Sequence, residues 1–349
     1  MNIESLLANC DLAIVTSPAS LKYLSGFDQS DAVILLTREE RIFVTNPLYE
    51  VAVKGVLSSE WEVRVLSRRE QWPCLRGAVA SAGKVGVEYG HMTIDLYHAL
   101  FGAEQVAKTV DITPSLAALR LVKTEDELAI IKHAEGIVDT VYSEILPLLQ
   151  VGVTEREIAT EIMLHLLRHG AEGTAFDTIV AFGERAAMPH AVPSDRVLRK
   201  GDCVLMDFGA KYRGYCSDFT RTVFCGEPTT RFREAYALVL GAQRAAIGYL
   251  IAGGRSAAEA DAVARRMIDD SAFKGAFNHT LGHGVGIDIH EAPALSQPSN
   301  HVLSDGMVFT VEPGIYVEGE FGIRIESLLA IEKGKLTVID RSDKEIFTV

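Results

Sequence analysis

The feature that most constrains this chain is a pair of apolar segments that carry an acid at the same place. Residues 201–209 read Gly-Asp-Cys-Val-Leu-Met-Asp-Phe-Gly, and residues 306–314 read Gly-Met-Val-Phe-Thr-Val-Glu-Pro-Gly. The first glycine, the acid (Asp207 or Glu312) and the last glycine each recur 105 positions later, from 201 to 306, from 207 to 312 and from 209 to 314. Both segments have the length and residue types of buried strands. They therefore indicate an internal repeat.

The repeat extends upstream of the strands. Thr154 with Glu157, and Ser256 with Glu259, have the spacing of capping boxes that open helices. We therefore expect two helix-then-strand halves arranged as a pseudo-twofold domain around a shared centre.

Two further acids follow the pattern. Asp218 lies in Ser-Asp-Phe-Thr-Arg-Thr-Val, and Glu326 lies in Gly-Ile-Arg-Ile-Glu-Ser-Leu-Leu. An ionised carboxylate inside an apolar strand is costly unless a partner neutralises it. One arginine explains one such acid, but four embedded acids together with a histidine cluster indicate a metal site.

Four histidines have an unusual context. His279, His283 and His290 fall within residues 279–290, and His190 lies in a proline-flanked segment. The spacing of His279 and His283 is that of a helical zinc pair, but the glycines at 282, 284 and 286 argue against a helix there. These glycines instead suit a close approach between backbone and ligand. We interpret the histidines as part of the same site as the acids.

The predicted ligand set is rich in carboxylate oxygen and contains one imidazole. Such a set suits Mn²⁺, Co²⁺ or Fe²⁺, and Zn²⁺ remains an alternative. Carboxylates can bridge two ions, and a water shared by the ions becomes a hydroxide at neutral pH. Histidines outside the ligand set would stabilise an oxyanion and move protons. The predicted chemistry is metal-assisted hydrolysis, most simply of an amide.

Composition excludes several other classes of function. The formal net charge of −13 argues against nucleic-acid binding as a main role. No apolar run is long enough to predict a membrane-spanning helix, and the first residues do not resemble a signal peptide. Five cysteines without Cys-x-x-Cys spacing predict free thiols and a cytoplasmic protein.

The chain is expected to divide near residue 120. In residues 1–120, the segments 32–37, 41–45, 61–66 and 84–88 are typical of strands, with a helix over 94–101. This predicts a small α/β domain. A capping box at Thr124 then opens a long amphipathic helix, which begins a second domain over residues 121–349.

The acidic and histidine segments resemble the dinuclear metallopeptidases with the pita-bread fold (peptidase family M24). The matching stretches are Met-Asp-Phe-Gly-Ala, Ser-Asp-Phe-Thr-Arg-Thr, His-Thr-Leu-Gly-His-Gly-Val-Gly, Val-Glu-Pro-Gly-Ile-Tyr and Gly-Ile-Arg-Ile-Glu-Ser. The resemblance covers residues from about 121 to 349. It implies a pseudo-twofold catalytic domain that binds two divalent metal ions, Mn²⁺ or Co²⁺ before Zn²⁺ or Fe²⁺.

The resemblance also implies a role for each site residue. The implied metal ligands are Asp207, Asp218, His283, Glu312 and Glu326, with Asp218 and Glu326 between the two ions. Glu312 would also accept a proton from the attacking water. His190 would contact the substrate, and His279 and His290 would hold it and stabilise the intermediate. Arg324, two residues before Glu326, would orient that ligand from behind.

The first 120 residues resemble the amino-terminal domain shared by proline-specific members and creatinase. Creatinase works without metal and lacks the acidic set, so the resemblance favours an Xaa-Pro dipeptidase or an Xaa-Pro aminopeptidase, acting on proline-containing dipeptides or short peptides. Members with this domain are commonly homodimers. A methionine-aminopeptidase-like enzyme and a non-catalytic peptide-binding relative remain as alternatives.

Overall fold

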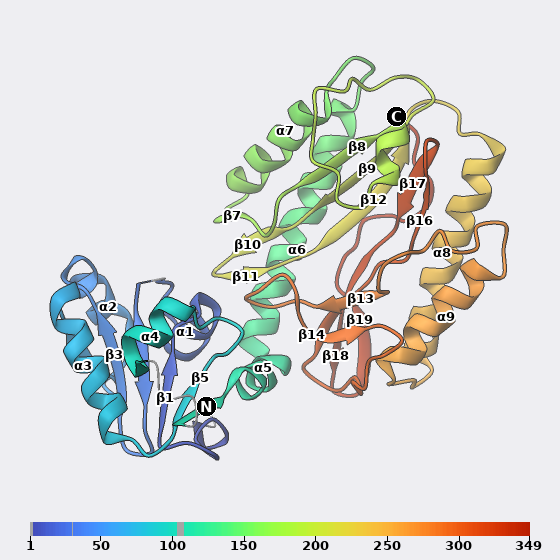
Figure 1. Ribbon diagram of the computed structural model, residues 1–349. Coiled ribbons are helices and arrows are strands. Elements are labelled where there is room, and N and C mark those ends of the chain that lie inside the picture. The colour runs from blue at the N-terminus through green and yellow to red at the C-terminus, as the bar shows by residue number, and fades with distance from the viewer. Residues whose placement is uncertain (1–2, 30, 103–107) are drawn as a thin grey trace. The chain divides into compact units, whose positions relative to one another are not determined.

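A computed structural model describes residues 3–29, 31–102 and 108–349 of the chain (Figure 1). The chain forms two compact units, Met1–Arg120 and Leu121–Val349, called here the smaller and the larger unit. Within the described residues, no helix is both long enough and apolar enough to cross a membrane.

The smaller unit is built on one mixed six-stranded sheet with the order β4-β3-β2-β1-β5-β6. Its strands are β1 (Leu12–Val15), β2 (Val33–Leu36), β3 (Arg41–Thr45), β4 (Glu62–Val65), β5 (Val85–Val87) and β6 (Thr109–Asp111). Its α-helices are α1 (Pro18–Ser25), α2 (Glu50–Val56), α3 (Arg68–Ser81), α4 (Ile94–Phe101) and α5 (Thr113–Leu121), with the 3-10 turns η1 (Ile3–Ser5) and η2 (Pro47–Tyr49).

Alternation along the strands gives this sheet two apolar faces. In β1, Ala13 and Val15 pack with side chains of α1, α2 and α5, whereas Leu12 and Ile14 pack with α3 and α4. A sheet covered by helices on both faces is an α/β domain, which confirms the predicted class. The strands expected between residues 32 and 88 all form, and the helix expected over 94–101 is α4.

One acid is buried in the smaller unit beside the start of α1. Glu88 accepts hydrogen bonds from the backbone N–H groups of Thr16 (2.9 Å) and Ser17 (3.0 Å), and from the hydroxyls of Ser17 (2.6 Å) and Ser20 (2.7 Å). Four donors thus satisfy both oxygens, and the carboxylate ties β1, α1 and the end of β5 together.

The larger unit repeats one arrangement of helices and strands. Its α-helices are α6 (Glu125–Ile145), α7 (Glu155–Arg168), α8 (Thr230–Ile251) and α9 (Ala257–Asp269), and its 3-10 turns are η4 (Leu146–Leu148) and η5 (Gly183–Ala187). Its strands are β7 (Gly173–Thr174), β8 (Ile179–Phe182), β9 (Cys203–Phe208), β10 (Ala210–Tyr212), β11 (Tyr215–Cys216), β12 (Phe219–Phe224), β13 (Gly282–Gly284), β14 (Glu291–Leu295), β15 (Val308–Val311), β16 (Gly314–Val317), β17 (Phe321–Arg324), β18 (Ser327–Glu332) and β19 (Lys335–Val338).

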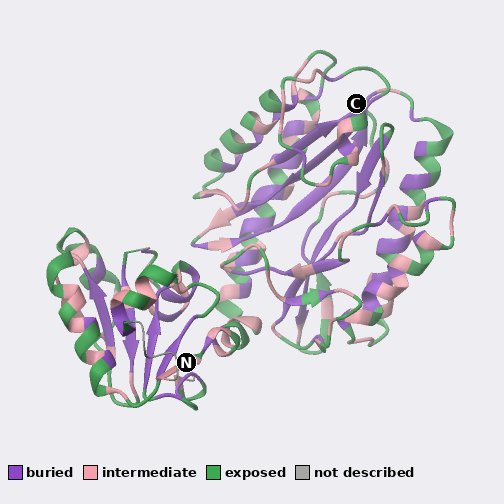
Figure 2. Ribbon diagram, viewed as in Figure 1, coloured by how far each residue is buried: buried purple, intermediate pink, exposed green. Residues whose placement is uncertain are grey.

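Each helix pair covers one main sheet of the larger unit. The helices α6 and α7 pack on the sheet β12-β9-β8, and α8 and α9 pack on the sheet β14-β13-β15-β18-β19. Smaller sheets have the orders β11-β10-β7 and β16-β17. Figure 2 shows the central strands of the larger unit mostly buried, β7, β10 and β19 less so, while the helices expose one side to solvent. The repeat seen in the sequence therefore appears as two helix-covered sheets.

The predicted helix starts are also present. Complete capping boxes form at Thr124 with Glu127 and at Thr154 with Glu157. At Ser256 the box is only half formed: its hydroxyl accepts from the N–H of Glu259, but the Glu259 carboxylate pairs with Arg266 instead of returning to the cap.

Candidate metal centre

Strand alternation sends the first acid into the interior of the larger unit. In β9, Val204, Met206 and Phe208 pack in the core beneath α6 and α7. Asp207 therefore points to the opposite face, toward the strands of the second half. Its antiparallel partner in β12 is Thr220, two residues beyond Asp218. The backbone N–H of Glu326 donates to the carbonyl of Thr220 (3.2 Å), which brings the second half alongside the first.

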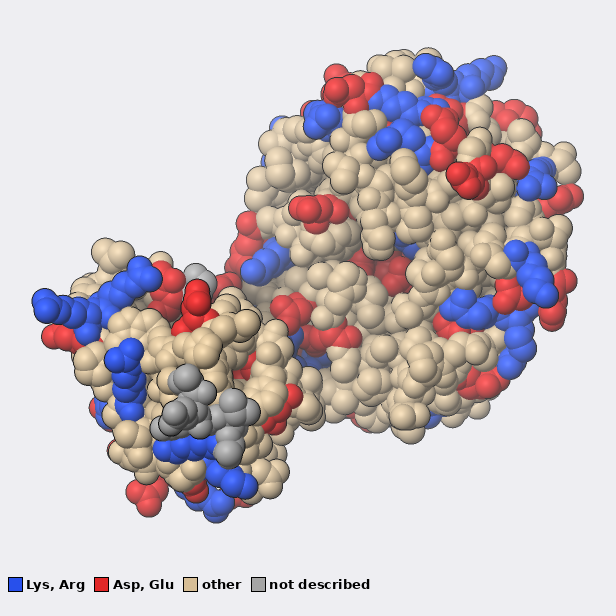
Figure 3. All heavy atoms as spheres, viewed as in Figure 1, with Lys and Arg blue, Asp and Glu red and all other residues tan. Residues whose placement is uncertain are grey.

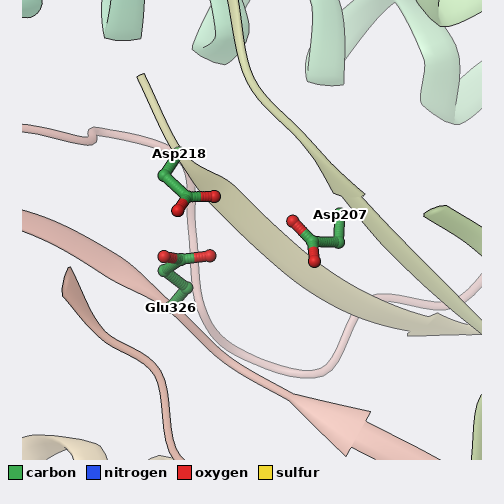
Figure 4. Close-up of side chains that lie close together, drawn as sticks. All are labelled: Asp207, Asp218 and Glu326. Atoms are coloured by element: carbon green, nitrogen blue, oxygen red, sulfur yellow. The ribbon is translucent and has the colours of Figure 1, made fainter. Parts of the chain in front are cut away.

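Three acids meet where these segments join. One carboxylate oxygen from each of Asp207, Asp218 and Glu326 lies within 4.8 Å of the other two, and all three residues are buried. Figure 4 shows the three carboxylates turned toward a common space. Asp207 comes from β9, Asp218 from the position just before β12, and Glu326 from the connection between β17 and β18. Such close like charges repel strongly in a buried site.

The bonding of this triad is incomplete. Glu326 accepts through Oε2 from the hydroxyl of Thr220 (2.8 Å), but within the described part of the chain its Oε1 has no partner, and neither has Oδ1 of Asp207. Burial raises the pKa of Asp218 to about 7 and the pKa of Asp207 and Glu326 above their usual values, and the neighbouring acids add to the effect. Bound cations would offset the repulsion between the acids and would give the two unbonded oxygens their partners.

His283 and Glu312 stand beside the triad. The Nε2 atom of His283 lies 3.3 Å from Oδ2 of Asp218 and 3.3 Å from Oε1 of Glu312, while its Nδ1 atom faces the carbonyl oxygen of Gly284 at 3.1 Å. Because Nδ1 is engaged by this carbonyl, Nε2 is the ring nitrogen that faces the acids. Although burial opposes the change, contact with His283 lowers the pKa of Glu312 to about 2. Thr310 donates to Oε1 of Glu312 (3.0 Å) and fixes its orientation.

Arg324 forms its direct ion pair with Asp207, whereas Glu326 was the acid that it was expected to orient. Its Nη2 atom forms a buried ion pair with Asp207, whereas it reaches Glu326 only through the Thr220 hydroxyl, to which Nε donates at 3.1 Å. Because Arg324 lies two residues before Glu326, it was expected to orient that ligand. The contacts link it directly to Asp207 and, through the Thr220 hydroxyl, to Glu326.

A chain of hydrogen bonds leads from Arg324 to His279. Arg324 donates through Nη1 to the Tyr316 hydroxyl (2.7 Å), which lies 2.9 Å from Nε2 of His279, and Nδ1 of His279 lies 2.8 Å from the carbonyl oxygen of Thr280. These contacts assign the tautomer with a proton on Nδ1 and make Tyr316 a donor to Nε2. Burial lowers the pKa of His279, which suits this neutral form.

A cleft of about 940 Å³ opens over these groups. It is lined by most of the predicted site residues, namely His190, Asp207, Asp218, His279, His283, His290, Glu312 and Arg324. The rings of His283 and His290 lie 4.4 Å apart between centroids. Figure 3 shows acidic atoms at the floor of a recess in the larger unit. Every predicted site residue except Glu326, which is buried in the triad, borders this cleft.

Three residues that support the site were not predicted from the sequence. Thr220, Thr310 and Tyr316 each bond to a predicted site residue. A signal for two of them was present, because Thr220 lies two residues after Asp218 and Thr310 two residues before Glu312. Strand periodicity places such neighbours on the same face. No comparable rule singles out Tyr316.

The glycines around His283 have a structural reason that differs from the expected one. A Cβ at Gly282 would lie 2.1 Å from the carbonyl oxygen of Thr310, and one at Gly284 would lie 2.1 Å from that of Ala292. The close approach is thus to neighbouring backbone, and no helix forms there, since these residues make up β13. The glycines let β13 pack tightly enough to place His283 beside the acids.

A buried carboxylate cluster with one imidazole, at the floor of a cleft between two related halves, defines a metal-dependent hydrolase. Comparison with known families agrees with this class. Residues 129–333 match metallopeptidase family M24, and residues 7–122 match the creatinase/prolidase N-terminal domain. The chain belongs to metallopeptidase family M24.

Relatives of known structure or name extend over both units. An Xaa-Pro dipeptidase of Lactobacillus delbrueckii subsp. lactis is 35% identical over 353 residues, which cover 96% of this chain and 94% of the relative. The structure of an Xaa-Pro dipeptidase from Bacillus anthracis matches with a TM-score of 0.92 and 34% identity, over 100% of this chain and 99% of that one. The structure of an X-Pro aminopeptidase from Thermotoga maritima MSB8 matches with a TM-score of 0.87 and 34% identity, over 97% and 98%.

Proposed function

We propose that this chain is a metal-dependent exopeptidase that hydrolyses the Xaa-Pro bond of dipeptides or short peptides. The observation that carries the proposal is the buried triad Asp207, Asp218 and Glu326, two of whose oxygens have no partner among the residues that the structure describes. Relatives that carry the names Xaa-Pro dipeptidase and X-Pro aminopeptidase support the choice of bond.

The donor set fits two divalent ions. The residues that would hold them are the four carboxylates and one imidazole of Asp207, Asp218, His283, Glu312 and Glu326, and Asp218 and Glu326 would each serve both ions. Carboxylate oxygens with a single nitrogen favour Mn²⁺ or Co²⁺, and Zn²⁺ and Fe²⁺ are the alternatives. The unbonded oxygens of Asp207 and Glu326 are the atoms that a cation would complete.

When bound, such ions would polarise the scissile carbonyl and lower the pKa of water to supply the nucleophile. Glu312 is the proposed proton acceptor. Its Oε1 atom is engaged by Thr310 and His283, whereas Oε2 lies 3.9 Å from the Nε atom of Arg324. Oε2 is thus the oxygen with room to take a proton from the attacking water.

The histidines of the cleft divide into two kinds. His279 is engaged at both nitrogens, by Tyr316 and Thr280, so we assign it to holding the wall of the site. His190 and His290 have exposed side chains and no hydrogen-bond partner among the described residues, so they are free to bond to substrate. They are the proposed groups that hold the peptide and stabilise the oxyanion.

Selectivity for proline follows from the substrate's own chemistry. An Xaa-Pro bond lacks an N–H, and its ring fixes the backbone. A cleft with apolar walls, such as those supplied here by Phe176, Ile179 and Ile289, can hold the ring without offering that nitrogen a hydrogen bond. The amino-terminal domain favours this assignment over a methionine-aminopeptidase-like one, because those enzymes resemble the catalytic half alone.

The test is a matched pair of peptides, Ala-Pro-Ala and Ala-Ala-Ala, together with the dipeptide Ala-Pro. We expect release of alanine from the proline peptides only. Equal or faster cleavage of Ala-Ala-Ala would contradict the proposal. The rates on Ala-Pro and Ala-Pro-Ala decide between a dipeptidase and an aminopeptidase.

The proposed working form is a cytoplasmic homodimer. The five cysteines Cys10, Cys74, Cys203, Cys216 and Cys225 are all free thiols, as a reducing compartment requires. Light scattering during gel filtration should give twice the 38.0 kDa mass of one chain. A mass of one chain at micromolar concentration would contradict the dimer.

A further inference from the structure

His190 depends on its loop for its position. The loop runs from Phe182, at the end of β8, through η5 to Ser194, and it carries His190 into the cleft. Among the described residues, the imidazole itself has no hydrogen-bond partner. Short turns shape the loop, with Met188 N–H donating to the carbonyl of Arg185 (3.0 Å) and Ala191 N–H to that of Met188 (3.1 Å). Whatever fixes the loop therefore fixes His190.

One buried carboxylate holds both ends of this loop. Glu155, in the first turn of α7, is completely buried. Its Oε1 accepts from the N–H of Phe182 (2.9 Å), and its Oε2 accepts from the N–H (2.9 Å) and the hydroxyl (2.6 Å) of Ser194. The two ends of the loop are thereby joined through a single side chain. The positive end of the helix dipole further favours a carboxylate at this place.

Arg185 extends the same network into the middle of the loop. Its Nε atom lies 3.0 Å from both oxygens of Glu155, and its Nη2 atom donates to the carbonyl of Val192 (2.7 Å). Val192 is two residues from His190. The ion pair thus neutralises the buried acid and braces the segment that bears the histidine.

We infer that Glu155, acting with Arg185, is the positioning residue for His190. The inference rests on the proposed function, in which His190 bonds to the substrate. Among the described residues, Glu155 bonds to Phe182, Arg185 and Ser194 and does not line the cleft, so its effect on catalysis passes through the loop. Four donor groups converge on its two oxygens, and an amide, with one acceptor oxygen, cannot serve them all.

The first experiment compares Glu155→Gln with the matched control Glu184→Gln. Glu184 lies in the same loop but is exposed and pairs with Arg196 (2.7 Å). For Glu155→Gln we expect kcat on Ala-Pro-Ala to fall by about 10²-fold, as for a misplaced catalytic group. Bound metal per chain and the dissociation constant for Mn²⁺ should stay at wild-type values. Glu184→Gln should match wild type. A wild-type kcat for Glu155→Gln would overturn the inference.

A double-mutant cycle with His190→Ala separates positioning from general damage. If Glu155 acts through His190, Glu155→Gln should lower kcat no further in the His190→Ala background. An equal further loss in that background would overturn the inference. If Glu155→Gln does not fold, Arg185→Lys replaces it in the same double-mutant cycle. This change keeps the positive charge but removes the planar guanidinium that bonds to Glu155 and Val192.

A spectroscopic readout makes the inference independent of activity. The imidazole signals of His190, assigned by their loss in His190→Ala, should shift or broaden in Glu155→Gln, while those of His279 stay unchanged. Unchanged His190 signals would overturn the positioning role. Absence of Xaa-Pro hydrolysis by the wild-type protein would instead contradict only the proposed function.

Discussion

The two units each bury acids, but they treat them differently. In the smaller unit, both oxygens of Glu88 are occupied by four donors of the chain itself. In the larger unit, Asp207 and Glu326 each keep one oxygen that has no partner among the described residues, and each has a carboxylate oxygen within 4.8 Å of one of Asp218. The difference separates an acid whose bonds are completed within the fold from acids that are proposed to bind a cation. Burial alone does not indicate a ligand, whereas clustering with incomplete bonding supports the proposal.

The largest effect should follow from loss of a shared ligand. Asp218→Asn should lose bound metal and lower kcat by more than the ~10²–10³-fold that removal of one charge-stabilising donor costs. The reason is that Asp218 is proposed to bind both ions. Elemental analysis and peptide hydrolysis measure the two effects. Two bound metals per chain in the Asp218→Asn variant would contradict the role proposed for Asp218.

The histidines should divide by whether they hold metal. His190→Ala and His290→Ala should keep their metal and lose turnover by ~10²–10⁴-fold, as expected for lost acid, base or oxyanion partners. His283→Ala should lose metal as well, because its Nε2 atom faces Asp218 and Glu312. Metal content and kcat of the three variants check this. Equal loss of metal in all three would refute the division.

In the smaller unit, the corresponding substitution should affect stability alone. Glu88→Ala leaves the donors of Thr16, Ser17 and Ser20 without their acceptor, and each unpaired buried donor costs about 1–3 kcal/mol. We expect a lower free energy of unfolding for this unit in urea and an unchanged metal content. Loss of metal in Glu88→Ala would show that Glu88 also affects metal binding in the larger unit, which contradicts a purely structural role.

The outline of the fold and the acids of the centre could be predicted from sequence because they depend on local periodicity. The strand pattern around Asp207 and around Glu312, and the boxes at Thr124 and Thr154, follow from rules that act within a few residues. The partner of Arg324 could not be predicted, because it depends on which strand lies alongside. The role of Glu155 could not be predicted for the same reason, since its partners, Phe182 and Ser194, lie 27 and 39 residues away in sequence.

Glu135 on α6 gives the smallest predicted effect and sharpens the comparison. It is fully buried, and neither of its oxygens has a partner among the described residues, yet it is not part of the triad. Burial, reinforced by Asp340 and other acids, raises its pKa well above 4.5. A lone unbonded acid is thus expected to be neutral rather than a ligand.

The pH dependence of stability tests this state. The folded chain keeps a proton on Glu135 that the unfolded chain releases above about pH 4.5, so the free energy of unfolding should fall as pH rises, by at most about 1.4 kcal/mol per pH unit. Glu135→Gln does not titrate, so its stability relative to wild type should increase from pH 4.5 to pH 8. A difference between the two proteins that is constant over this range would refute the raised pKa.

The most direct test of the central claim is a titration of metal-free wild-type protein with Mn²⁺, in which bound metal and the rate of Ala-Pro-Ala hydrolysis are followed together. The account predicts no hydrolysis without metal and a rate that reaches its maximum as two ions bind per chain. Full activity of protein shown by elemental analysis to be free of metal would contradict it.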